Sequence, residues 1–157
     1  MIGRRRIWRD AVGVGLGLGL LAAPAGGAPR EMLAGPVPAR LVAVIDGDTI
    51  RVRARIWLDQ EVETAVRLHG VDAPELTGAC AAERALALDA RDFLAARAGT
   101  AELTLSDIAH DKFGGRVVAR VRTSAGLDLA AALLAAGLAR PYEGGPRPSW
   151  CAQASVE

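Results

Sequence analysis

Apolar and polar residues alternate along the middle of the chain in a pattern that is typical of strands. Between residues 50 and 56, isoleucine, valine and alanine alternate with three arginines, which indicates a half-buried strand with a basic outer face. An apolar run over 41–45 precedes this segment, and a further strand is predicted over 62–71. The same period of two returns over 103–107 and 117–121. The sequence therefore predicts five strands.

Two other segments have the character of helices. Residues 83–97 consist of strong helix formers with one apolar stripe, and Gly99 follows as a stop signal. A second helix is predicted from Asp128, a good N-cap, to Ala136. Gly137 is expected to end that helix in a Schellman-type closure, in which the next leucine packs back on the last turn.

The predicted order is three strands, a helix, two strands and a second helix. This is the order of a mainly β protein with helices (α+β), built as a five-stranded OB-type barrel with two helices. Such barrels commonly bind oligonucleotides or oligosaccharides, but a fold by itself does not define a function. The chain has 157 residues, of which 51% are hydrophobic, so we expect one domain with a real core.

The N-terminal part of the chain has the composition of an export signal. Residues 1–25 hold four arginines, then an apolar run and an Ala-Pro-Ala exit, which predicts a signal peptide cut after Ala25. The alternative is an uncleaved anchor, but the apolar run is glycine-rich and shorter than the about 20 residues that a bilayer span needs. A flexible leader is predicted over 26–39 and the domain over 40–157. We expect a periplasmic or secreted monomer, without a stable membrane partner unless the signal stays uncleaved.

Charge and cysteine content narrow the expected chemistry. Removal of the signal would change the formal net charge from +1 to about −2, so the mature chain is not a generally basic nucleic-acid binder. A few focused arginines would have to bind any phosphate. In an exported protein the two cysteines, Cys80 and Cys151, are expected to form one disulfide, although two buried free thiols are the alternative. With two histidines and no C-x-x-C pair, a zinc site is not expected.

Two acidic clusters directly follow predicted strands. One is Asp46-Gly47-Asp48-Thr49, and the other is Asp72-Ala73-Pro74-Glu75. Carboxylates at the ends of adjacent strands can converge outside a sheet, and an all-oxygen site suits a hard cation such as Ca²⁺ or Mg²⁺. We therefore predict Asp48 and Asp72 as cation ligands, with ordinary turn formation as the alternative. Asp46 is expected either to support the ligands from behind or to shape its turn.

Four motifs in order carry a resemblance to a known family. The segments VIDGDTI, VRLHGVDAPE, DKFGGRVVARV and GLARPY resemble the thermonuclease (staphylococcal-nuclease-like) family over about residues 41–142. The resemblance implies an OB-type barrel, Ca²⁺ as cofactor, and DNA or RNA as substrate. It also implies hydrolysis of phosphodiester bonds by direct attack of water, with 3′-phosphates as products.

The resemblance assigns roles within the two acidic clusters. Asp48 and Asp72 match the two calcium carboxylates of the family. Ala73 stands where the family usually has threonine and is expected to ligate through its backbone carbonyl, so the missing hydroxyl matters little. Glu75 matches the carboxylate that acts as general base or positions the water.

The resemblance also identifies two phosphate-binding arginines, each with a geometric requirement. Arg67 lies an odd number of residues before Asp72, so a regular strand would put them on opposite faces and a bulge or bend near His69-Gly70 is needed. Arg116 follows two glycines, where the family usually has one. The extra residue leaves open which face of the strand Arg116 lies on, and Arg120 is the alternative. Arginine suits both places because its planar fork binds phosphate through two parallel hydrogen bonds.

The main alternative to an enzyme is a catalytically inactive OB-type module that binds single-stranded nucleic acid. Such a module is expected to have lost one or more of the residues that cleavage requires. All of them are present in this sequence, which favours the enzyme: Asp48, Arg67, Asp72, Glu75 and Arg116. Tyr142 is expected either to stack on a base or to pack in the fold. A third option, an envelope domain that binds glycan or protein, has no dedicated feature in the sequence.

Overall fold

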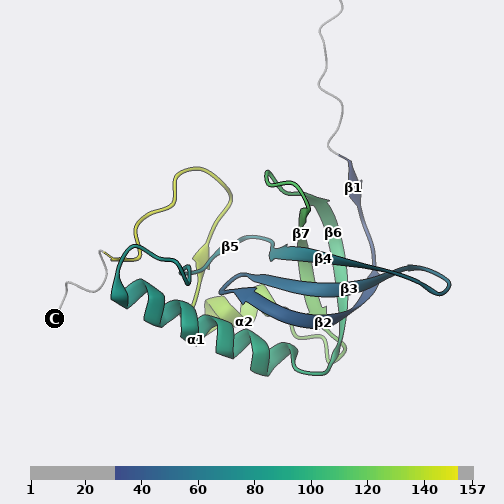
Figure 1. The fold of residues 1–157 in the computed structure, drawn as a ribbon, viewed down its shortest axis with the longest axis horizontal. Coiled ribbons are helices and arrows are strands. Elements are labelled where there is room, and N and C mark those ends of the chain that lie inside the picture. The colour runs from purple at the N-terminus through teal and green to yellow at the C-terminus, as the bar shows by residue number, and fades with distance from the viewer. Residues whose placement is uncertain (1–30, 152–157) are drawn as a thin grey trace, which may run out of the picture.

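Five strands close into a barrel in the computed structural model, which describes residues 31–151 (Figure 1). Around the barrel the order is β2-β3-β4-β7-β6 and back to β2; β4 and β7 run parallel, and the other neighbours run antiparallel. This is the OB-type barrel that the sequence predicts. The strands are β2 (Val37–Asp46), β3 (Thr49–Trp57), β4 (Gln60–Leu68), β6 (Glu102–His110) and β7 (Arg116–Thr123).

Two helices, α1 (Ala81–Ala98) and α2 (Leu129–Ala135), complete the predicted architecture. In α1 the Gly99 N–H donates to the Ala95 carbonyl at 2.9 Å, which ends the helix where the sequence indicates. The Schellman closure of α2 is also confirmed, because the N–H groups that follow its C-cap donate back to its last turn. These bonds are Gly137 N to Leu134 O at 3.1 Å and Leu138 N to Leu133 O at 3.0 Å.

The core lies inside the barrel and under the helices and consists of aliphatic side chains. Ile50, Val66 and Leu103 are buried within it, and α1 and α2 add Leu94 and Leu133. Since each buried aliphatic side chain contributes about 1.5–3 kcal/mol, this shared core fixes both helices against the strands. Neither helix within residues 31–151 has the length and apolarity of a membrane span.

The segment predicted as a flexible leader is partly strand, which corrects the prediction for its described part. Strand β1 (Met32–Leu33) pairs with β6, and β2 already begins at Val37. Val37 packs against the core and Ala39 is buried in it, so burial outweighs the missing N–H of Pro38. Residues 26–30 and the predicted signal peptide lie outside the described residues.

The strand predicted over 62–71 divides into two, and this division places the end of the chain beside the barrel. Strand β4 ends at Leu68, and β5 (Val71–Asp72) pairs with β8 (Arg140–Pro141). The chain beyond β8 then loops back past β5 towards the start of α1 (Figure 1). There Cys151 forms a disulfide with Cys80, with their Cα atoms 5.9 Å apart, as the sequence predicts.

Candidate active site

A sharp turn after β4 brings Arg67 and Asp72 together. The turn is formed by His69 and Gly70, and Gly70 has φ +82°, a left-handed conformation that suits glycine. The Arg67 guanidinium reaches over the turn, where its Nη2 donates to the Val71 carbonyl at 3.0 Å and lies 4.0 Å from Asp72 Oδ1. The predicted departure from a regular strand near His69-Gly70 is therefore confirmed.

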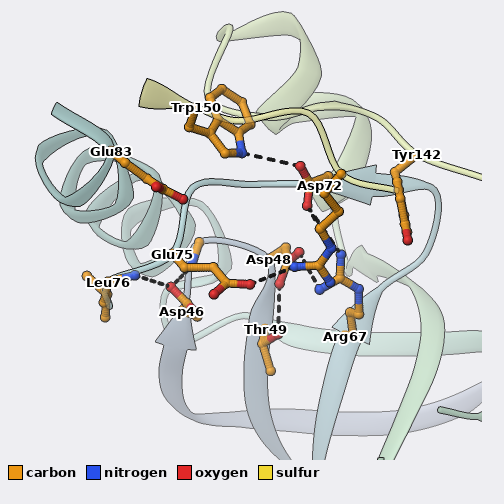
Figure 2. Close-up of polar contacts among 12 residues, drawn as sticks. Asp46, Asp48, Thr49, Arg67, Asp72, Glu75, Leu76, Glu83, Tyr142 and Trp150 are labelled. Atoms are coloured by element: carbon orange, nitrogen blue, oxygen red, sulfur yellow. Dashed lines mark hydrogen bonds and ion pairs between the residues drawn. The ribbon is translucent and has the colours of Figure 1, made fainter. Parts of the chain in front are cut away.

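Asp48 faces the same guanidinium from the turn between β2 and β3 (Figure 2). Its Oδ2 pairs with Arg67 Nη1 at 2.7 Å, and its Oδ1 accepts from the Thr49 hydroxyl at 2.8 Å. Burial raises the pKa of Asp48, and the Arg67 charge and the Thr49 hydrogen bond oppose this rise without cancelling it. Arg67 thus contacts both of the predicted cation ligands, which lie on separate segments, Asp48 in the β2–β3 turn and Asp72 in β5.

Asp72 is almost fully buried, and its two oxygens have different neighbours. Its Oδ2 accepts from the Trp150 indole at 3.2 Å, as Figure 2 shows. The same oxygen accepts from Arg140 Nε at 3.0 Å and lies 2.9 Å from Arg140 Nη2. Its Oδ1 lies 3.3 Å from Arg147 Nε. Sequence reasoning missed all three partners. Arg140 belongs to the GLARPY motif and was detectable there, whereas Arg147 and Trp150 follow in irregular chain that carries no periodic signal.

Asp46 and Gly47 hold the two acidic loops against each other. Asp46 Oδ1 accepts from the Gly47 N–H at 2.9 Å and from the Leu76 N–H at 3.1 Å (Figure 2). A Cβ at Gly47 would lie 2.9 Å from both the Ala73 Cβ and the Pro74 carbonyl oxygen. Only glycine permits this approach, and Asp46 has the turn-shaping role that its position predicts.

Four of the predicted site residues line one small cavity of about 170 Å³. They are Asp48, Arg67, Glu75 and Arg116. Asp72 and Ala73 line an adjoining hollow of about 200 Å³, which shares Glu75 with the cavity. The other residues around the cavity are Asp46, Thr49, Lys112, Phe113 and Arg147.

The turn between β6 and β7 positions Arg116 at this cavity. The turn closes with a hydrogen bond from the Asp111 N–H to the Arg116 carbonyl at 3.2 Å, and Gly115 takes φ +76°. The Arg116 side chain pairs with the Asp111 carboxylate. Arg120, the alternative, pairs instead with Asp107 at 3.0 Å and is absent from the cavity lining, so the geometry favours Arg116.

A longer groove of about 680 Å³ runs past the cavity, and its lining includes three arginines and Lys112 together with the acidic Asp111 and Glu143. Tyr142 lies in its wall, with the Arg67 and Arg147 guanidinium groups 5.9 and 5.6 Å from its ring centroid. The basic and histidine side chains along the groove are Arg67, His69, His110, Lys112, Arg116 and Arg147. The focused positive charge that a chain of low net charge needs for phosphate binding is present here.

The donor set at the two acidic loops fits a hard divalent cation. Asp48 in the β2–β3 turn and Asp72 at the end of β5 are buried carboxylates, and both contact the same arginine. Two buried carboxylates need compensating positive charge, which arginines supply in the described structure and a cation also supplies. Ala73, for which a ligand role through its backbone carbonyl is predicted, lines the same hollow as Asp72.

The structure is an OB-type barrel with an acidic site bordered by arginines. A family model described as staphylococcal nuclease homologue (SNase) matches residues 65–152, and the chain belongs to this family. No curated protein matches the chain. The matched range includes Arg67, Asp72, Glu75 and Arg116 but begins after Asp48, so the assignment of Asp48 depends on its motif and its contact with Arg67.

Proposed function

We propose that the chain is a Ca²⁺-dependent nuclease that hydrolyses phosphodiester bonds of DNA or RNA by direct attack of water. The family relationship supports a nuclease, and the main structural support is the single cavity bordered by Asp48, Arg67, Glu75 and Arg116. Hydrolysis of a phosphodiester requires an oriented water and positive charge where the transition state gathers negative charge. Each requirement has a matching side chain at this cavity.

Three groups would hold the cation: the carboxylates of Asp48 and Asp72 and the backbone carbonyl of Ala73. The bound ion would supply positive charge to a non-bridging phosphate oxygen. Glu75 is half-exposed at the rim of the cavity and would orient the attacking water and accept its proton.

Arg67 and Arg116 would bind the phosphate from two sides. Arg67 is fixed by its bond to the Val71 carbonyl, so its remaining N–H groups are held in place before substrate arrives. Arg116 is the first residue of β7, which pairs with β4 beside Arg67, and it lines the same cavity. Two planar forks that converge on one phosphate stabilise the charge of the transition state without large rearrangement.

The proposal also covers the ends that cleavage leaves on the nucleic acid and the compartment in which the protein acts. The family resemblance favours cleavage that leaves 3′-phosphates. The disulfide between Cys80 and Cys151 supports an exported protein, because such bonds persist in oxidising compartments. The arginine-rich, apolar N-terminus is the sequence feature that would direct export to the periplasm or the medium.

A second candidate function is binding of single-stranded nucleic acid without cleavage. One observation favours it: both phosphate-binding arginines are paired with carboxylates in the described structure, Arg67 with Asp48 and Arg116 with Asp111. An inactive module would keep these pairs and bind nucleic acid only along the groove.

Cleavage assays with single-stranded DNA and RNA distinguish the two functions. The full-length chain is incubated with each substrate in Ca²⁺, in Mg²⁺ and in excess chelator, and binding is measured in parallel by electrophoretic mobility shift. The nuclease proposal predicts fragments in Ca²⁺ that disappear with chelator, with ends that accept ligation only after removal of a 3′-phosphate. Binding without fragments in any divalent ion would favour the inactive module.

A further inference from the structure

Arg147 links the two acidic residues that the proposed mechanism uses most. Its Nε lies 3.3 Å from Asp72 Oδ1, and its Nη1 lies 2.6 Å from Glu75 Oε1. No role follows for this arginine from the motifs, because it lies in the Gly- and Pro-rich segment beyond Tyr142. Within the described residues it pairs with a predicted cation ligand and with the predicted water-binding carboxylate at the same time.

Arg147 contacts the less strongly held oxygen of Asp72, which is the one more open to a cation. The other oxygen, Oδ2, is held by Arg140 and by the Trp150 indole, and Arg140 is fixed in turn by the Pro148 carbonyl and by the Trp150 ring. Oδ1 has weaker partners, Arg147 at 3.3 Å and Arg67 at 4.0 Å. A divalent ion at Asp72 would therefore compete with Arg147 for Oδ1.

Arg147 is also the arginine best placed to change partners. Arg67 is buried and bound to a backbone carbonyl, whereas the Arg147 side chain is 28% exposed. Two glycines, Gly144 and Gly145, precede it in the same loop with φ values of +108° and +93°. This side chain can leave Asp72 without breaking a core contact, whereas Arg67 cannot.

The surroundings of Arg147 offer a new partner for its guanidinium. Arg147 lines the site cavity, the adjoining hollow and the long groove, so it lies where the three meet. A nucleic-acid strand in the groove that places one phosphate in the cavity brings neighbouring phosphates past this point. The guanidinium fork of an arginine binds a phosphate as readily as it binds a carboxylate.

We propose that Arg147 is a third phosphate-binding arginine, which holds Asp72 and Glu75 while the cation is absent and transfers to a backbone phosphate when cation and nucleic acid bind. This exchange builds on the proposed nuclease function. It has two consequences of opposite sign: removal of Arg147 strengthens binding of the cation alone, and it weakens binding of the nucleic acid.

The first consequence is tested by calorimetric titration of Ca²⁺ into the full-length chain without nucleic acid. Arg147→Gln removes the guanidinium that competes with Ca²⁺ for Asp72. The dissociation constant for Ca²⁺ is therefore expected to fall about five-fold, the size expected for loss of one partly exposed ion pair. Arg40→Gln is the matched control. It removes the same charge from an exposed pair with Glu61 that borders neither the cavity nor the groove, and should leave the constant unchanged.

The second consequence is tested with a single-stranded DNA hexamer whose linkages are phosphorothioates that slow hydrolysis, at saturating Ca²⁺. Fluorescence polarisation over a range of salt concentrations gives the slope of log K against log salt. Loss of one phosphate contact lowers the magnitude of this slope by about 0.7 for a single strand. Arg147→Gln should show this decrease, Arg40→Gln should not, and Arg147→Lys should restore the slope with weaker affinity because it keeps the charge and loses the fork.

The outcomes separate this proposal from the nuclease proposal. Ca²⁺ binding in Arg147→Gln that is equal to or weaker than in the parent overturns the exchange, and so does an unchanged salt slope. Neither readout requires turnover. A chain that never cleaves but shows both binding effects of Arg147→Gln would refute the nuclease proposal and support the exchange. An active nuclease whose Arg147→Gln variant binds Ca²⁺ and DNA like the parent would support the nuclease proposal and refute the exchange.

Discussion

Arg67 connects the parts of the site at the scale of single residues. It pairs with Asp48 at 2.7 Å, lies 4.0 Å from Asp72 and donates to the Val71 carbonyl. Removing one partner of such a buried cluster leaves an uncompensated charge, which typically costs about 3–5 kcal/mol.

The charges of the Asp48 and Asp72 carboxylates are balanced by arginines in the described structure. An entering dication therefore adds positive charge that a phosphate can offset, which couples cation binding to substrate binding.

Arg116 and Arg120 provide a matched pair at this scale, since both lie on β7 and each pairs with an aspartate. Arg116→Ala removes a cation from the cavity lining and should lower kcat about 100-fold or more, the usual cost of one transition-state donor. Arg120→Ala removes an exposed ion pair with Asp107 and should keep kcat within about two-fold. Steady-state cleavage of single-stranded DNA measures kcat for both variants. A larger loss in Arg120→Ala than in Arg116→Ala would show that the extra glycine shifts Arg116 out of the predicted position and that Arg120 takes its role.

At the scale of elements, the site depends on the contact between the β2–β3 turn and the loop after β5. Asp46 bonds to Leu76, and Gly47 lies against Ala73 and Pro74. These contacts are side-chain and backbone packing between segments up to 30 residues apart in the sequence. They hold Asp48, which lines the site cavity, near Asp72, which lines the adjoining hollow.

The Gly47→Ala variant tests this contact. The added methyl group would lie 2.9 Å from the Ala73 Cβ and the Pro74 carbonyl oxygen, so the loops must separate at a cost of about 1–3 kcal/mol in the free energy of unfolding. Gly114→Ala is the control because its Cβ would enter open space, and its effect should stay below about 1 kcal/mol. Urea unfolding measures both. Equal stability of Gly47→Ala and the parent would contradict the contact.

Local sequence patterns were sufficient for most of the elements but not for the contacts around Asp72. Alternation identified three of the barrel strands and an apolar run marked a fourth, and Asp128 and Gly137 marked the ends of α2, because such signals act within a few residues. The pairing of β5 with β8 brings Arg140, Arg147 and Trp150 to Asp72 from about 70 residues away. No local pattern encodes such a pairing. The segment 31–39 was mispredicted as a flexible leader for the same reason, because β1 and the start of β2 are stabilised by pairing with the distant strand β6.

At the scale of the whole molecule, the disulfide joins the first turn of α1 to the segment that carries the Asp72 partners. Cys80 is the N-cap of α1, and Cys151 follows Trp150 directly. The bond spans a sequence separation of 71 residues. It therefore fixes Trp150 beside Asp72 and also restricts the unfolded chain.

Replacement of both cysteines by serine should lower the free energy of unfolding by about 4 kcal/mol, from the loop-closure entropy of this separation. Serine can still cap α1, so the loss is attributable to the bond and not to the cap. Urea unfolding with and without reductant measures the effect: the parent should lose stability in reductant, and the double variant should not respond. A parent that is insensitive to reductant would contradict a stabilising role.

The central claim is that the cavity bordered by Asp48, Arg67, Glu75 and Arg116 performs the hydrolysis, and single-turnover cleavage by Glu75→Gln tests it most directly. The amide keeps the size of the side chain but cannot accept a proton from water, so the cleavage rate should fall about 100-fold or more. Ca²⁺ and single-stranded DNA should still bind, as calorimetry and polarisation would show. Cleavage by Glu75→Gln at the parent rate, with Ca²⁺ bound, would contradict the account.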